Sequence, residues 1–180
     1  MALKEYRDPI LKKLIDMLET EGPAELAGHY IYGDTLAPPR SRLPIVSVAR
    51  DTSRVGSDGT MQDRRTHTIT MAIIVDYTKD LNESFDLSRG TTTLYRLIEE
   101  SYEDETDPNY LAVKPKTIVY ALRNNLKLAD NLFISIRNDD ELSIDYKLGI
   151  EKRGSGIWSV EGILRFSMES TQARPGLYPS

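Results

Sequence analysis

Hydrophobic and polar residues alternate most regularly in residues 66–77, THTITMAIIVDY. This run is rich in β-branched residues, which favour a pleated, half-buried surface. Successive side chains of a strand point to opposite faces, so one face would carry every second residue of the run. We predict a central strand whose inward face holds His67, Ile69, Met71, Ile73, Val75 and Tyr77.

A second alternating run lies near the C-terminus, in GIWSVEGILRFSMES. Its period of two predicts another long strand, with Ile157 and Ile163 as the main exceptions. We expect this strand to pair with residues 66–77 in the core, although the two runs are far apart in the sequence. Its inward positions are Trp158, Val160, Leu164, Phe166 and Met168.

The first helix is predicted over residues 9–21. Asp8 is a good N-cap and Pro9 suits the first helical position, while Gly22-Pro23 provides the stop. An apolar stripe at helical spacing favours a helix packed on the sheet over one that lies on a membrane or binds a partner. The stripe consists of Ile10, Leu11, Leu14, Ile15 and Leu18.

Two further helices are predicted. The stretch 87–103, LSRGTTTLYRLIEESYE, suits a helix capped by Asp86 or Ser88. Residues 117–124 fit either a helix or a strand, because Ile118 and Val119 are β-branched, and we favour a short helix. The predicted buried face of the longer helix holds Leu87, Thr91, Leu94, Tyr95, Ile98 and Tyr102.

Shorter strands are expected where apolar runs are bounded by glycine, proline and asparagine. The HYIYG segment suits a short strand, and residues 45–50 suit another that begins after Pro44. Late in the chain, residues 132–137 and 142–150 are expected to be strands. Residues 151–156, EKRGSG, would then form a hairpin loop before the last strand.

Residues 51–65, DTSRVGSDGTMQDRR, are the most polar segment between two predicted strands. Either they form a long hairpin tip, or both strands continue through them and project an arm. Long loops in compact domains are often functional, so the segment is either a docking arm for a partner or a merely disordered tip. Phosphate binding by its arginines is the less favoured alternative, because three aspartates lie among them. We predict subunit or partner contacts by Asp51, Arg54, Asp58, Asp63, Arg64 and Arg65 in this arm and by Arg174 in an extended tail, residues 171–180.

The order of the predicted elements is helix, strand, arm, strand, helix, short helix and then strands joined as hairpins. Helices that are segregated from hairpins favour an α+β fold. We therefore predict one domain over residues 1–180, with an antiparallel or mixed β-sheet, helices packed on one face, and a projecting loop or hairpin arm.

Composition and charge argue against several classes of function. The 180 residues include no cysteine and two histidines, which excludes disulfides and thiolate metal sites. The net charge of −5 argues against a nonspecific nucleic-acid binder, since such domains usually carry a basic surplus. No apolar run approaches the roughly 20 residues of a membrane span, so no membrane association is expected.

Candidate chemistry is sparse. His67 and His29 have no local serine or carboxylate at a spacing that indicates a triad or a metal site. The acidic residues between 99 and 107 lack the spacing of a calcium loop, and a solvated helix end explains them. We therefore expect no enzyme, no cofactor and no metal. A nucleic-acid-processing enzyme stays as the alternative, and it would require these histidines or carboxylates to converge in one pocket with a metal.

The whole pattern resembles a known family. Four features carry the resemblance, namely RLPIVSVARD leading into a polar arm, then THTITMAIIVDYTKD, the helix after Leu87-Ser88, and the late GIWSVEGILRFSMES strand. Together they resemble the tail terminator proteins of long-tailed bacteriophages. The resemblance rests on element order and strand texture over most of the chain. It implies an α+β protomer that forms a homohexameric ring on the tail tube, stops tube growth and offers the docking surface for the head.

The resemblance also implies partners and a location. They would be further copies of the chain, the tail tube protein, a neck or head-completion protein and, as an optional further partner, the tail sheath. DNA would pass through the lumen without specific binding, and the protein would be a virion component assembled in the host cytoplasm. The segment 25–42 is longer and richer in proline than a minimal terminator requires. A related neck or head-completion connector therefore remains the alternative interpretation.

Overall fold

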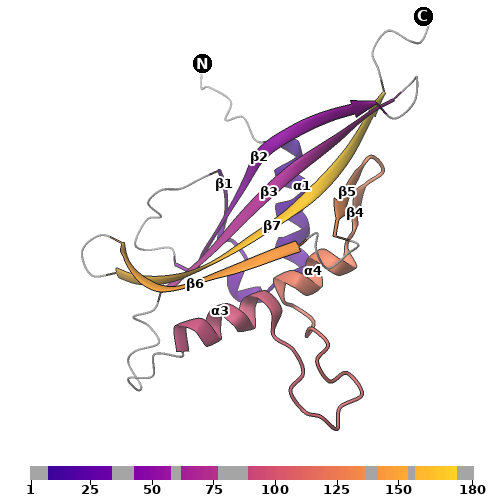
Figure 1. Cartoon of the computed structure of the whole chain (residues 1–180). Coiled ribbons are helices and arrows are strands. Elements are labelled where there is room, and N and C mark those ends of the chain that lie inside the picture. Colours follow the sequence, from indigo (N-terminus) through magenta and orange to yellow (C-terminus); the bar gives the residue numbers. More distant parts are fainter. Residues whose placement is uncertain are drawn as a thin grey trace, which may run out of the picture.

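The computed structural model describes residues 8–33, 43–57, 62–76, 89–136, 142–153 and 157–173. These residues form a mixed sheet, three α-helices and one short 3-10 turn (Figure 1). In chain order the elements are α1 (Pro9–Glu21), the 3-10 turn (Ala24–Leu26), β1 (Tyr30–Tyr32), β2 (Ile45–Ser57), β3 (Gln62–Asp76), α3 (Arg89–Glu99), α4 (Ile118–Asn124), β4 (Lys127–Ala129), β5 (Leu132–Ser135), β6 (Leu142–Arg153) and β7 (Ile157–Ala173).

The two long strands predicted from the alternating runs lie side by side at the centre of the sheet. β3 pairs antiparallel with β7 along its full length, from Gln62 opposite Ala173 to Asp76 opposite Ser159. β2 pairs antiparallel with the other side of β3, and β1 adds to β2 in parallel, which makes the sheet mixed. The far side of β7 is shared by β5 near its C-terminal end and by β6 near its N-terminal end.

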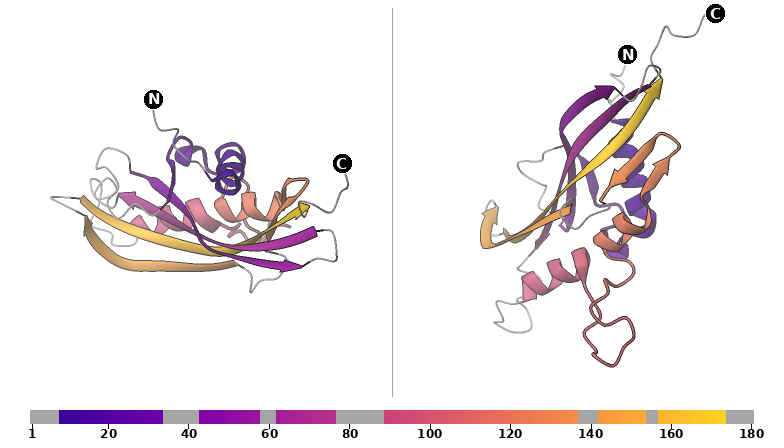
Figure 2. Two further views of the ribbon diagram at one scale, coloured as in Figure 1. Left: turned by 90° about the horizontal axis from the view of Figure 1, so that it is seen from above. Right: turned by 45° about the vertical axis from the view of Figure 1, so that its right-hand side comes forward.

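All three α-helices lie on one face of the curled sheet (Figure 2). Side chains from α1, α3 and α4 join the inward residues of β2, β3 and β7 in one core. The inward face of β3 is the predicted one, because His67, Ile69, Met71, Ile73 and Val75 are all buried. The predicted fold class, an α+β fold with a mixed sheet and helices on one face, is confirmed.

Helix α1 begins and ends where the sequence predicted. Asp8 caps it, since its Oδ1 accepts a hydrogen bond from the N–H of Ile10 at 2.9 Å. At the other end the chain passes close to the last turn, and a Cβ on Gly22 would lie only 2.6 Å from the Leu18 carbonyl oxygen. Glycine therefore fits this stop for steric reasons. The buried residues of the helix are Leu11, Leu14, Ile15 and Leu18.

Helix α3 differs from its prediction in the face that it buries. Leu94 and Ile98 are buried as expected, but their third partner is Leu97, while Tyr95 remains 37% exposed. The hydroxyl of Tyr95 lies 3.2 Å from the hydroxyl of Ser101, so the ring leans along the surface. Positions 94, 97 and 98 and positions 94, 95 and 98 both fit helical spacing, so the spacing alone did not distinguish the two faces.

Helix α3 is also shorter than predicted. It ends at Glu99, and Tyr102 belongs to the following loop, where its N–H donates to the carbonyl of Ala112 at 3.1 Å. The returning loop thus captures backbone groups that a longer helix would have used. The predicted caps, Asp86 and Ser88, lie outside the described residues.

The C-terminal half contains more strand than the sequence indicated. β4 was not predicted, because three residues carry almost no periodic signal. β6 runs to Arg153, so part of the predicted hairpin loop is paired, and β7 runs to Ala173, three residues into the predicted tail. The short helix is confirmed as α4, with the Thr117 side chain accepting from the N–H of Tyr120 at 3.2 Å.

Candidate functional site

The predicted arm is largely part of the sheet. β2 continues to Ser57 and β3 begins at Gln62, so the strands do continue through the polar segment. β7 follows β3 to its first residue, which makes the outer part of the hairpin three strands wide (Figure 1). A projecting arm is therefore not confirmed.

A β-bulge marks the point where the hairpin enters its polar half. Arg50 lies opposite Ile69 and Thr52 lies opposite Thr68, so Asp51 has no counterpart on β3. Bulges bend a strand and increase its twist. The Asp51 carboxylate accepts a hydrogen bond from the Thr70 hydroxyl, so this predicted contact residue already has a partner within the sheet.

The predicted arginines separate onto the two faces of the hairpin. Arg54 and Arg64 share the face turned away from the helices, because the strand alternates and Arg54 lies opposite Thr66. Arg64 forms an ion pair with Glu169 of β7 at 2.5 Å. Arg54 is exposed. The predicted contacts Asp58 and Arg174 lie outside the described residues.

Asp63 and Arg65 lie on the opposite face, in line with His67. Both side chains are partly exposed. The Nε of Arg65 is buried and has no hydrogen-bond partner. The five predicted contact residues that the structure describes therefore do not form one surface, and Arg65 belongs to a different environment from Arg54 and Arg64.

The outer edge of β2 is open along most of its length. β1 pairs with β2 only at Val46–Val48, and within the described residues no other strand pairs with that edge. The side chains from Asp51 to Gly56 are all exposed, and Val55 is 61% exposed. Such an edge presents unpaired backbone N–H and C=O groups that can pair with another chain.

A hollow of about 550 Å³ lies beside the first turn of α1, on the helix-covered face of the sheet. It is walled by α1, β2, β3, β7 and the β4–β5 hairpin. Basic side chains from three separate elements line it, and its apolar wall includes Ile10 and Leu132. The basic residues are Lys13, Arg50 and Arg65, with His67 beside them.

His67 is the most buried polar residue of this hollow, with an exposed fraction of 1%. Its Nε2 lies 2.8 Å from the Ser170 hydroxyl, and its Nδ1 has no hydrogen-bond partner. Burial, followed by the positive charge of Arg50, lowers the pKa of His67. The folded chain therefore favours the neutral form of the imidazole. Arg50 itself forms an ion pair with Asp8 at 2.9 Å.

The other candidate groups do not join His67. His29 is absent from the hollow, and so is every acidic residue between 99 and 107. Within the described residues, no three histidine or carboxylate side chains are grouped so that they could hold a metal. The convergence that the alternative nucleic-acid-processing enzyme requires is not seen in this part of the chain.

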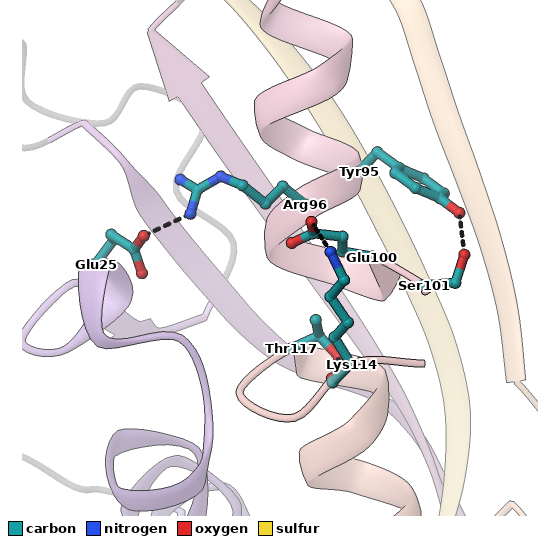
Figure 3. Close-up of polar contacts among 7 residues, drawn as sticks. All are labelled: Glu25, Tyr95, Arg96, Glu100, Ser101, Lys114 and Thr117. Carbon is teal, nitrogen blue, oxygen red and sulfur yellow. Dashed lines mark hydrogen bonds and ion pairs between the residues drawn. The ribbon is translucent and has the colours of Figure 1, made fainter. Parts of the chain in front are cut away.

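The acidic residues between 99 and 107 form contacts close to their own loop instead. Glu100 forms an ion pair with Lys114 at 2.6 Å across the base of the loop, as Figure 3 shows. Its hydrogen bond raises the pKa of Lys114. Asp104 accepts two hydrogen bonds from Thr106, which lower the pKa of its carboxyl. These carboxylates stabilise the turns of the loop.

Two further polar contacts connect α3 to its surroundings. Arg96 forms an ion pair with Glu25 of the 3-10 turn at 2.6 Å (Figure 3), and this hydrogen bond lowers the pKa of Glu25. Glu99 accepts a hydrogen bond from the Tyr146 hydroxyl at 2.6 Å. Burial, with the added effect of Glu99, raises the pKa of that phenol. These groups tie the helix to the 3-10 turn and β6.

The chain matches no protein-family model and no curated protein. In the part of the chain that the structure describes, no helix is long and apolar enough to cross a membrane.

Proposed function

We propose that this chain is a structural virion protein that assembles into a ring, terminates the tail tube of a long-tailed bacteriophage and offers the docking surface for the head. Its partners are further copies of itself, the tail tube protein and a neck or head-completion protein. In this proposal the protein performs no catalysis and needs no cofactor.

The observation that carries the proposal is the open outer edge of β2. A ring requires heterologous contacts, in which one surface of a protomer meets a different surface of its neighbour. An exposed strand edge serves this purpose by pairing with a segment of another chain. The edge runs beyond Val48 to Ser57, and the exposed Val55 offers an apolar side chain within it.

Charge supports the same proposal. Six copies, each at a formal −5, would carry −30. An acidic lumen repels the phosphate backbone, so DNA could slide through such a ring without being gripped. Support also comes from the long central strands and the order of helices and strands, which agree with those predicted from the sequence apart from β4 and the projecting arm.

The first experiment is a mass measurement. Light scattering of the purified protein, with and without tail tubes from its own virion, should give a hexamer, or a monomer that forms rings only at tube ends. A monomer or dimer that is indifferent to tubes would contradict the proposal. A ring that ignores tubes but binds a head connector would replace the terminator by a neck or head-completion protein.

A matched pair of variants tests the strand edge. Val55→Lys places a charge on the open edge, which natural sheets use to prevent edge pairing. We expect this variant to fold normally but to lose ring formation. Tyr110→Lys, at another exposed apolar residue in the loop after α3, is the control and should assemble as the unmodified protein does. Assembly by Val55→Lys together with failure of Tyr110→Lys would place the contact elsewhere.

A further inference from the structure

The hollow beside α1 concentrates positive charge without matching negative charge. Lys13, Arg50 and Arg65 converge there from a helix and two strands, and none of the described residues that line the hollow carries a carboxylate. Asp8 neutralises Arg50 through their ion pair. Among the described residues, neither Lys13 nor Arg65 has a carboxylate partner. The hollow therefore keeps a surplus of positive charge in a chain whose overall charge is −5.

Two residues that line the hollow each hold a buried nitrogen atom without a hydrogen bond. These atoms are Arg65 Nε and His67 Nδ1, which belong to successive inward positions of β3. An unsatisfied buried donor is costly, and more so when it belongs to a charged group. The Arg65 Nε–H is always a donor, because the guanidinium does not lose its proton in proteins. An acceptor in the hollow would remove its cost.

His67 can serve as the second donor. Its Nε2 is bonded to the Ser170 hydroxyl, which can either donate or accept. When the hydroxyl donates to Nε2, the proton of the neutral ring lies on Nδ1. Nδ1–H then becomes a donor that needs an acceptor of its own. In that tautomer both nitrogen atoms are donors that an oxygen atom would satisfy, and the surrounding cations favour a negatively charged one.

We propose that this hollow is a binding site for an oxyanion of the phosphate class, held by Arg65, Lys13 and His67. A fork of guanidinium N–H groups matches the geometry of phosphate oxygens. The hollow, at about 550 Å³, has the size of a small-molecule site and includes the apolar side chains of Ile10 and Leu132. It therefore has room for a phosphate that carries a small organic group. This inference does not depend on the proposed ring.

Calorimetric titration of the full-length protein tests it. The probes are inorganic phosphate and glycerol phosphate, each compared with sodium chloride at equal ionic strength and pH 7. Binding of either phosphate beyond the chloride control supports the site, and the tighter of the two shows whether the organic group is recognised. If neither binds beyond the chloride control, the proposal is overturned.

Four variants assign the binding to this hollow. Arg65→Gln should weaken binding by about tenfold or more, because it removes a charge-assisted hydrogen bond. Lys13→Gln should weaken it by about threefold, since an exposed charge contributes less. Asp8→Asn keeps an N-cap but releases Arg50, so it should tighten binding by about threefold. Lys12→Gln changes the neighbouring lysine, which pairs with Asp16 and does not line the hollow, and should bind as the unmodified chain does.

Nitrogen-15 spectra of the histidine rings give a readout that does not depend on affinity. Addition of phosphate should shift His67 to the form with its proton on Nδ1 and leave His29 unchanged, with His29→Gln used for assignment. Binding that leaves the His67 signals and the Arg65→Gln affinity unaltered would place the anion elsewhere and contradict the proposal.

Discussion

The inward face of β3 changes character along the strand. From Val75 to Ile69 every inward side chain is apolar and buried, whereas the next two inward positions hold His67 and Arg65. Buried polar groups are usually hydrogen-bonded, yet each of these residues keeps one buried nitrogen without a partner. At this scale the sequence predicted the direction of His67 from strand alternation but gave no sign of what surrounds it.

The lowered pKa of His67 predicts a pH dependence of stability. Because the folded chain holds this imidazole neutral, the unfolded chain binds the proton more readily. The free energy of unfolding should then fall as the pH drops below about 6.5, the ordinary histidine value. Urea unfolding at pH 7.5 and 5.5, in phosphate-free buffer, measures this fall.

His67→Gln should remove most of that difference between the two pH values, whatever it does to stability at pH 7.5. The matched control is His29→Gln, the other histidine of the chain, which should leave the difference in place. An equal pH dependence in the unmodified protein and His67→Gln would contradict the assignment.

Gly162 on β7 predicts a packing effect. A Cβ there would lie 2.5 Å from Ile98 Cδ1 and 3.3 Å from Leu94 Cδ2, where α3 packs on the sheet. Gly162→Ala should therefore destabilise the protein by about 1–3 kcal/mol, the usual cost of overpacking a core. Gly56→Ala is the control, since its nearest neighbour is the Arg64 carbonyl oxygen at 3.8 Å, and it should change stability by less than about 0.5 kcal/mol. Thermal unfolding of both variants measures these changes in stability.

At the scale of elements, the first turn of α1 connects the helix to the sheet. One oxygen of Asp8 accepts the capping hydrogen bond and the other pairs with Arg50 of β2 at 2.9 Å. The capping residue thus stabilises the helix and also fixes its position against the strand that carries the bulge at Asp51.

Substitutions at Asp8 separate these two roles. Asp8→Ala removes both interactions and should cost about 1–2 kcal/mol of stability. Asp8→Asn retains a capping oxygen and loses the ion pair, so its cost should be smaller, within about 1 kcal/mol. Chemical denaturation measures both values. Equal losses for the two variants would show that the cap contributes nothing.

Local patterns predicted the elements whose information lies within one stretch. The Asp8-Pro9 start, the stripe of α1 and the alternation of β3 and β7 each specify their element and its inward face. The position of Leu97 in the core and the early end of α3 depend on a loop that returns to Tyr102, and no local pattern indicates that contact. β4 is too short to show a period.

The candidate site was less predictable for the same reason. The hollow takes one lysine or arginine from each of α1, β2 and β3, and Lys13 and Arg50 have ordinary surroundings in the sequence. The one available signal was the pair of inward positions 65 and 67, where a long apolar face turns polar. Six of the seven predicted contact residues belong to one polar segment, and strand alternation places Arg64 and Arg65 on opposite faces.

For the whole molecule, the pairing pattern predicts where stability is concentrated. β7 is bonded to β3 on one side and to β5 and β6 on the other, and its middle packs under α3. Native-state hydrogen exchange should therefore be slowest for residues 69–75 and 160–166. The amides of β4 and of the outer half of β2 should exchange much faster. Uniform protection along β2 in the monomer would contradict the open edge.

The strand that closes this sheet is made after all the other described elements. As the chain emerges from the ribosome, β3 is synthesised before its long antiparallel partner β7. β5 and β6 also precede β7, the strand through which they are joined to β3. The pairing of β3 with β7 spans a large sequence separation, which slows folding and leaves the edge of β3 exposed in the meantime. We infer that folding is completed only after synthesis has delivered β7, and that a chain cut short before Ile157 remains open and prone to aggregate.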